Sequence, residues 1–161
     1  MKLEKAIFAC GCFWGAQYQF EHAKGVVRST VGYIGGHKGH PAYEEVKAHT
    51  TGHAEATLVE FDAEQTSFTE LCKLFFEIHD PAQTDGQGPD IGPQYRSEIF
   101  YLNDKQKEEA EAVIALLREK GYEVNTKLTP ATTFWEGEEY HQHYYDKTGG
   151  EPYCHIRIKK F

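Results

Sequence analysis

The chain lacks any apolar run close to the roughly 20 residues that a membrane-spanning helix needs. Its first residues carry charge and no long apolar stretch, so we expect no signal peptide and a cytoplasmic protein with reduced thiols. It also lacks a basic excess, because the formal net charge is −8 without any block of like charge. Phosphates require a basic face, so we expect neither nucleic acid nor membrane among its partners.

Internal repeats and low-complexity stretches are absent as well, which excludes repeat architectures. A length of 161 residues suits one domain with a substantial buried core. No linker interrupts the pattern of apolar and polar residues. We therefore expect a single catalytic domain over residues 1–161, working as a monomer.

Evidence for a metal site is also weak. A zinc site usually pairs its ligands as C-x₂-C, whereas the closest cysteines here, Cys10 and Cys12, are spaced C-x-C. Histidines scattered through loops are more often solvated than metal-bound, and that interpretation covers His37, His40, His141 and His143. We expect no metal and no cofactor. Catalytic or redox chemistry is the better explanation of the four cysteines, Cys10, Cys12, Cys72 and Cys154.

The hydrophobic pattern alternates between strand and helix periods. It predicts strands at 5–9, 26–34, 54–61, 97–102 and 122–128, and helices at 13–23, from Ser67 to before Pro81, and from a cap at Asp104 to about 120. Two β-α-β units followed by one more helix and strand predict an α/β fold, an α+β sandwich with a ferredoxin-like split βαβ core. The loops 35–52 and 81–93 are long enough to be functional. A partly helical segment at 133–145 and an irregular C-terminal tail complete the prediction.

Cys12 follows a buried strand and directly precedes a helix. Unpaired backbone N–H groups and the helix dipole at that position favour an anion, which lowers the pKa of a cysteine there. The thiolate is the nucleophilic form, so the position favours reactivity. A buried structural cysteine fits the position equally well. The aromatic residues Phe13 and Trp14 come next, and they can either wall a small apolar slot beside the thiol or face the core.

Four segments together resemble the A-type peptide methionine sulfoxide reductases. They are 11–15 (GCFWG), 52–56 (GHAEA), 87–92 (QGPDIG) continued by 94–97 (QYRS), and 140–142 (YHQ). They occur in the family's order and cover nearly the whole chain. The resemblance implies a sandwich of the kind just described, and reduction of the S epimer of methionine sulfoxide, in proteins or free, to methionine.

The resemblance also implies a role for each matching residue. Cys12 corresponds to the nucleophile, and Phe13 and Trp14 to the aromatic residues that hold the substrate's S-methyl group. Glu55 corresponds to the proton donor. Tyr43 and Tyr95 correspond to the tyrosines that hydrogen-bond the sulfoxide oxygen. Asp90 corresponds to an acidic residue of the same pocket.

These residue types suit the reaction, because sulfoxide oxygen leaves only when it is protonated. A neutral acid near pH 7 requires a buried carboxyl group with a raised pKa. Taken alone, Glu55 reads as a solvated strand residue, the tyrosines as half-buried surface residues and Asp90 as a turn residue.

Attack by Cys12 leaves a sulfenic acid, which a second thiol can convert to a disulfide. The resemblance favours Cys154 in the C-terminal tail for this step, with thioredoxin (or dithiothreitol) as the reductant. Cys10 is the competing thiol, although its place at a strand end points it toward the core. Cys72 reads as a structural helix residue.

Two other classes of protein remain open. One is a redox-sensing binding protein that uses the same thiols without turnover. The other is a thiol acyltransferase or hydrolase, in which Cys12 pairs with a histidine such as His53.

Overall fold

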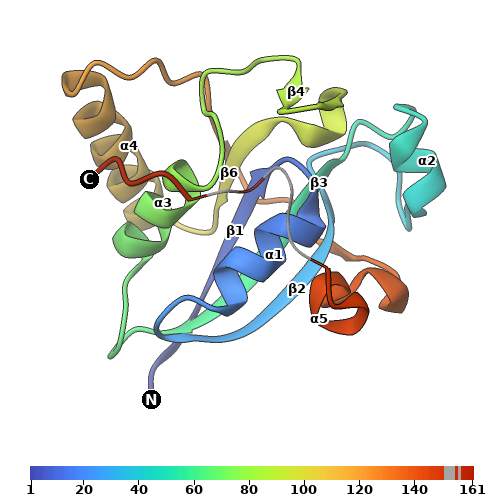
Figure 1. Ribbon diagram of the computed structural model, residues 1–161, viewed down its shortest axis with the longest axis horizontal. Coiled ribbons are helices and arrows are strands. Elements are labelled where there is room, and N and C mark those ends of the chain that lie inside the picture. Colours follow the sequence, from blue (N-terminus) through green and yellow to red (C-terminus); the bar gives the residue numbers. More distant parts are fainter. Residues whose placement is uncertain (151–154, 156) are drawn as a thin grey trace.

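A computed structural model describes residues 1–150, 155 and 157–161 of the chain. A mixed sheet lies at its centre, with strand order β7-β6-β1-β3-β2-β8 (Figure 1). The strands are β1 Leu3–Cys10, β2 Val26–Ile34, β3 Ala54–Asp62, β6 Ser97–Tyr101, β7 Lys127–Pro130 and β8 Trp135–Glu136. The small hairpin of β4 Gly86–Gln87 and β5 Asp90–Ile91 lies apart from this sheet. The helices are α1 Phe13–Glu21, α2 Tyr43–Lys47, α3 Phe68–Glu77, α4 Asp104–Glu119 and α5 Tyr144–Thr148.

The four central strands confirm the predicted split βαβ core. Strand β3 lies between β1 and β2 and runs antiparallel to both, so α1 connects two parallel strands that are not neighbours. Strand β6 pairs antiparallel with the other side of β1. The third crossover, through α4, adds β7 parallel to β6.

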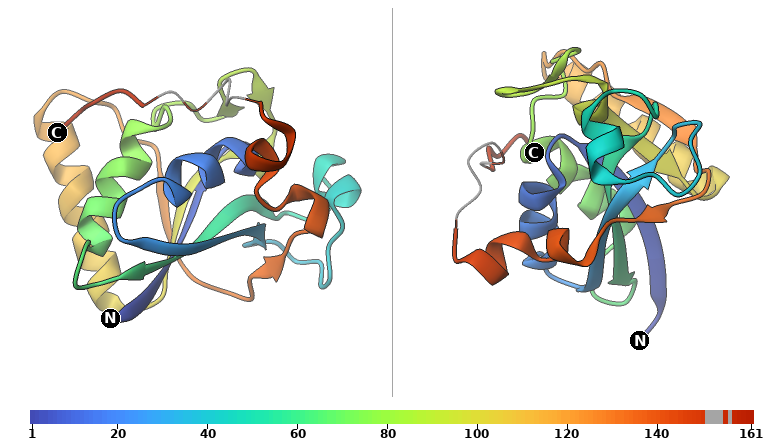
Figure 2. Two further views of the ribbon diagram at one scale, coloured as in Figure 1. Left: turned by 60° about the horizontal axis from the view of Figure 1, so that its bottom comes forward. Right: turned by 90° about the vertical axis from the view of Figure 1, so that its right-hand side faces the viewer.

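The larger core lies between the sheet and the helices. Alternate residues of β1 point to the helical side, and the ring of Phe8 stacks on Phe20 of α1 at 5.0 Å and on Phe75 of α3 at 5.3 Å. Helix α4 completes the layer by packing against α3, as the two neighbouring helices in Figures 1 and 2 show. Each such buried aromatic ring contributes roughly 1.5–3 kcal/mol of transfer free energy. A smaller core lies on the opposite face of the sheet, where Ala131 and Phe134 pack against it.

Helix ends follow ordinary capping chemistry. Helix α3 begins after Ser67, whose hydroxyl accepts a hydrogen bond from the Glu70 N–H at 3.1 Å, as predicted. The predicted cap at Asp104 is wrong by one residue. The side chain of Asn103 accepts from the Gln106 N–H at 2.9 Å, and Asp104 is the first helical residue.

Two other predictions need correction. The last long strand was expected from Tyr122, but β7 begins at Lys127, because residues 122–126 only lead the chain back to the sheet edge. The loop 35–52 is not irregular throughout, since it contains the short helix α2. Within the described residues, no helix is both long and apolar enough to cross a membrane.

Candidate active site

The residues singled out by their sequence motifs lie close together at one end of the central strands. Cys12 follows the end of β1, and Tyr43 lies in the connection that leaves the end of β2. Glu55 lies at the beginning of β3, where it pairs with Tyr33 of β2. Tyr95 ends a short 3₁₀ turn just before β6, whose first residue pairs with Cys10. The antiparallel register therefore brings four distant segments to the same place.

Cys12 is the N-cap residue of α1 and is only 8% exposed. The turn that delivers it requires a glycine at position 11, because Gly11 has φ +100° and a Cβ there would lie 2.8 Å from the Cβ of Gln87. The thiol thus lies at the positive end of the helix dipole, as the sequence predicted.

Glu55 is buried beneath the start of α1, with 2% of its surface exposed. Its Oε1 accepts a hydrogen bond from the N–H of Phe13 at 3.2 Å. Its Oε2 is also buried and has no hydrogen-bond partner among the described residues. The pKa of Glu55 is raised to about 8, chiefly by burial; the Phe13 hydrogen bond opposes this rise, and the negative charge of Asp90 adds to it. The structure therefore contradicts the solvated-strand interpretation of this residue.

Tyr43 and Tyr95 are half-buried beside this carboxyl group. Burial raises the pKa of each phenol well above its usual value, and the charges of Glu55 and Cys12 raise it further. Both hydroxyls therefore keep their protons at neutral pH and can act as donors. Asp90, in β5, is half-buried and its charge acts on Glu55 and on Tyr95.

The two aromatic residues after Cys12 differ in burial and in their stacking partners. Phe13 is fully buried, with its ring 5.7 Å from that of Tyr33 and 6.4 Å from that of Tyr43. Trp14 is half-buried and stacks on Tyr144 of α5, with ring centroids 3.8 Å apart and planes 7° from parallel. An apolar wall therefore extends from the thiol toward α5.

His141 is the residue whose place in this wall the sequence did not reveal. Its Nδ1 accepts a hydrogen bond from Trp14 Nε1 at 2.9 Å, and its ring lies 4.3 Å from that of Tyr43. Burial lowers the pKa of His141, so the ring is neutral and its proton is on Nε2. That nitrogen is buried without a partner among the described residues. The YHQ segment marked the position, but only the fold brings it against Trp14.

The neighbouring Glu138 was not predicted either. Its carboxylate accepts from the Tyr33 hydroxyl at 2.7 Å and from the Tyr43 N–H at 3.0 Å. It therefore fixes the start of α2, and with it the Tyr43 side chain, relative to β2.

His53, the histidine named for the cysteine-histidine alternative, has other partners. His53 Nδ1 accepts from the Gly36 N–H at 3.0 Å, and its Nε2 lies 2.6 Å from the Lys38 carbonyl oxygen. Both ring nitrogens are thus engaged within the loop, which leaves neither for the Cys12 thiol.

The other cysteines differ in place. Cys10 and Cys72 are buried in the large core, as expected for a strand end and a helix interior. Cys154 lies outside the described residues. The next residue, His155, is fully buried against the start of α1, and its Nε2 lies 2.7 Å from the Cys10 carbonyl oxygen.

Comparison with known proteins decides the family. The family model described as peptide methionine sulfoxide reductase matches residues 4–161. The chain belongs to this family. The reductase MsrA of Geobacter sulfurreducens is 47% identical over 151 residues, which covers 92% of this chain and 93% of that protein. MsrA of Acinetobacter baumannii is 44% identical over 156 residues, covering 97% and 90%.

The fold agrees with that assignment. The reduced form of Mxr1 from Saccharomyces cerevisiae superimposes with a TM-score of 0.89 at 33% identity, covering 97% of this chain and 92% of Mxr1. The chain is therefore an oxidoreductase of the peptide methionine sulfoxide reductase family. The family match spans every residue that converges at the sheet edge, and it includes Cys154.

Proposed function

We propose that this enzyme reduces the S epimer of methionine sulfoxide, in proteins and as the free amino acid, to methionine. One observation carries the proposal: a carboxyl group with a raised pKa, that of Glu55, is buried directly beside the N-cap cysteine. A thiolate and a neutral acid next to each other are the pair that sulfoxide reduction needs.

In the first step, the Cys12 thiolate attacks the sulfoxide sulfur while Glu55 gives its proton to the oxygen. Tyr43 and Tyr95 donate hydrogen bonds to that oxygen as its charge develops, an effect of the oxyanion-hole type. The sulfur–oxygen bond of the substrate breaks, the oxygen and its proton end on Cys12 as a sulfenic acid, and methionine leaves. Burial keeps the proton on Glu55, and the negative charge of Asp90 adds to that effect.

Phe13 and Trp14 supply the contact for the S-methyl group. The oxygen donors and the aromatic wall are held by different elements, so their positions relative to the thiol are fixed. Inversion at sulfur exchanges the oxygen with another substituent of the substrate, which would place the oxygen away from Glu55. This arrangement supports selectivity for one epimer.

In the second step, the Cys154 thiol attacks the sulfenic acid, a disulfide with Cys12 forms, and water leaves. Support comes from His155, the next residue in the chain, which lies against the same end of α1 that carries Cys12. Cys10 is less suited, since its place within the core shields it. Thioredoxin would then reduce the disulfide; yeast Mxr1 has been solved in complex with Trx2.

The enzyme would work without a cofactor, as one catalytic domain, as a monomer and in the cytoplasm.

The experiment that tests the function separates the two epimers. With dithiothreitol as the reductant, we expect conversion of the S epimer to methionine and none of the R epimer. Cys12→Ser should remove the activity, because a hydroxyl is a far weaker nucleophile than a thiolate. Cys72→Ala, a change in the core away from the site, is the matched control and should stay active. Conversion of neither epimer by the wild-type enzyme would refute the proposal.

A further inference from the structure

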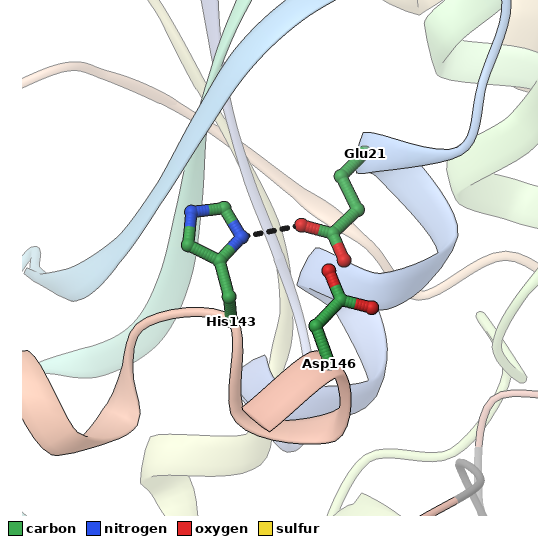
Figure 3. A group of neighbouring side chains, drawn as sticks. All are labelled: Glu21, His143 and Asp146. Carbon is green, nitrogen blue, oxygen red and sulfur yellow. Dashed lines mark hydrogen bonds and ion pairs between the residues drawn. The ribbon is translucent and has the colours of Figure 1, made fainter. Parts of the chain in front are cut away.

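The far end of α1 carries a second group of chemically active side chains. Glu21 is the last residue of α1, and His143 and Asp146 belong to the start of α5 (Figure 3). With 1.5 Å of rise per residue, the nine-residue helix places Glu21 about 13 Å from the Cys12 end. The group is therefore separate from the reductase site.

The three side chains converge on one point. Their ligand atoms, two carboxylate oxygens and an imidazole nitrogen, all lie within 4.8 Å of one another. His143 Nδ1 lies 2.5 Å from Glu21 Oε2, and Figure 3 shows the Asp146 carboxylate next to the same Glu21 carboxylate. His22 Nδ1 is 4.0 Å from Glu21 Oε1 but also bonds the Tyr18 carbonyl oxygen at 2.7 Å.

The charges in this group do not balance. Two carboxylates lie next to each other, and one of them is at the C-terminal end of a helix, where the dipole disfavours negative charge. Arg28 lines the same surface pocket, yet none of the ion pairs found among the described residues joins it to either carboxylate. Among the described basic residues, only His22 and His143 lie within 4.0 Å of Glu21. A bound cation would relieve this crowding.

A second, independent observation points to a ligand. Ser29 of β2 lines the same pocket, whose volume is about 490 Å³, together with Glu21, His143 and Asp146. Only 3% of the surface of Ser29 is exposed, and its hydroxyl oxygen has no hydrogen-bond partner among the described residues. A buried hydroxyl without a partner costs free energy, which a turn of the side chain toward a water held by a bound ion would recover.

We propose that Glu21, His143 and Asp146 bind one divalent transition-metal ion of the Zn²⁺ class, with water as the fourth ligand facing Ser29. One imidazole and two carboxylates are a ligand set that Zn²⁺ accepts, at bond lengths of about 2.0–2.2 Å. Those lengths place ligand atoms roughly 3.4 Å apart in a tetrahedron. The observed spacing needs only side-chain rotation to reach it, and Asp146 is exposed and able to turn. The proposal departs from the prediction that none of the histidines binds a metal.

Binding would have a structural consequence. Glu21 belongs to α1 and the other two ligands to α5, so the ion would join the two elements that carry Trp14 and its stacking partner Tyr144. The site would thus act as a clamp on the aromatic wall.

Titration of the wild-type enzyme with Co²⁺ and Zn²⁺ tests the proposal. We expect one ion per chain with a Kd below about 100 µM. The bound Co²⁺ should show ligand-field absorption without the intense sulfur-to-metal band that a cysteine ligand produces. In histidine NMR spectra of the wild-type protein, Zn²⁺ should shift the imidazole signals of His143 while those of His37, an exposed loop residue, stay in place.

Variants locate the ion. Glu21→Gln, His143→Ala and Asp146→Asn should each weaken binding by more than about 100-fold, beyond the loss usual for an outer-shell residue, whereas His37→Ala should have no effect. Ser29→Ala should weaken it by less, about 10-fold. No saturable binding, a cysteine-derived band, or unchanged affinity in Glu21→Gln would each overturn the proposal. The chemistry at Cys12 uses none of these residues, so reductase activity measured without added metal reports whether a variant is folded.

Discussion

The two carboxyl oxygens of Glu55 have different surroundings. One carboxyl oxygen accepts the N–H of Phe13, and the other is buried without a partner. In the proposed mechanism, the second oxygen is the one that protonates the substrate oxygen. Because an unpartnered buried oxygen costs free energy, the free enzyme keeps a cost that substrate binding can relieve.

The first prediction concerns the proton on that oxygen. Glu55→Gln keeps the shape of the side chain but supplies no proton, so methionine formation in a single turnover should slow by about 10²–10⁴-fold. In the wild type, the fraction of protonated Glu55 falls as pH rises through about 8, and that alkaline loss should be absent from the variant. Rapid-quench measurements between pH 6 and 9 would show it.

The matched control is Glu60→Gln on the same strand, on the other face of β3. It should leave the rate and its pH profile unchanged. An unaltered rate in Glu55→Gln would assign the proton to another group.

At this scale the sequence was informative about residue types and less so about surroundings. The position of Cys12 before a helix was readable, because a strand followed by glycine and an apolar helical pattern marks the junction. The burial of Glu55 was not readable, since strand alternation defines two faces without telling which one α1 covers. The role of His141 was missed because its hydrogen-bond partner, Trp14, is 127 residues away in the sequence.

Helix α1 is the element against which His155 of the C-terminal tail packs. Gly15, one turn after Cys12, faces His155, and a Cβ at that position would lie 2.4 Å from His155 Nδ1. The tail can therefore approach the helix closely only because Gly15 has no side chain.

The second prediction follows from that approach. Gly15→Ala should destabilise the enzyme by about 1–3 kcal/mol through overpacking, despite the better helix propensity of alanine. Turnover with thioredoxin should fall more than the single-turnover release of methionine, because the displaced segment includes the residue next to Cys154. Chemical denaturation and the two assays would be compared.

The double variant Gly15→Ala/His155→Ala provides the control. Removal of the imidazole makes room for the new methyl group, so the two changes should be non-additive by about 1 kcal/mol or more. Simple additivity would show that the contact does not cause the loss.

Regular elements were predicted well where local chemistry decides them. Strand β2 has the expected bounds, and α3 has the expected cap, because alternation and a Ser-x-x-Glu pattern are local signals. The short elements β8 and α2 were missed, since each is stabilised by distant partners. Glu138, for example, holds the first residue of α2 across 95 positions.

For the whole molecule, burial of Glu55 makes stability depend on pH. Between its ordinary pKa of 4.5 and its folded pKa of about 8, the folded protein keeps a proton that the unfolded chain releases. The contribution of this residue to the free energy of unfolding therefore falls as pH rises through that window.

The third prediction uses this dependence. Glu55→Gln lacks the titration, so it should be more stable than the wild type at pH 8, by on the order of 3 kcal/mol. The advantage should disappear as pH falls below 4.5, where the wild type becomes protonated in both states. Urea denaturation at a series of pH values measures it, and a constant difference across the series would contradict the assigned burial cost.

The fourth prediction concerns the complete catalytic cycle. Cys154→Ser should release about one methionine per enzyme, because attack by Cys12 needs no second thiol, but turnover with thioredoxin should fail, because no disulfide forms for it to attack. Mass spectrometry of the oxidised wild type should show a bond between Cys12 and Cys154. A mapped bond between Cys10 and Cys12, with normal cycling of Cys154→Ser, would assign resolution to Cys10 instead.

The sheet also has two different ends, one that carries the candidate site and one that does not. Every segment of the candidate site leaves or enters the sheet at the edge where Cys10 pairs with Ser97. The turns at the other edge, such as residues 63–66 between β3 and α3, carry none of that chemistry. A fluorescent or affinity tag inserted there would report on the working enzyme from the side opposite to its substrate and its reductant.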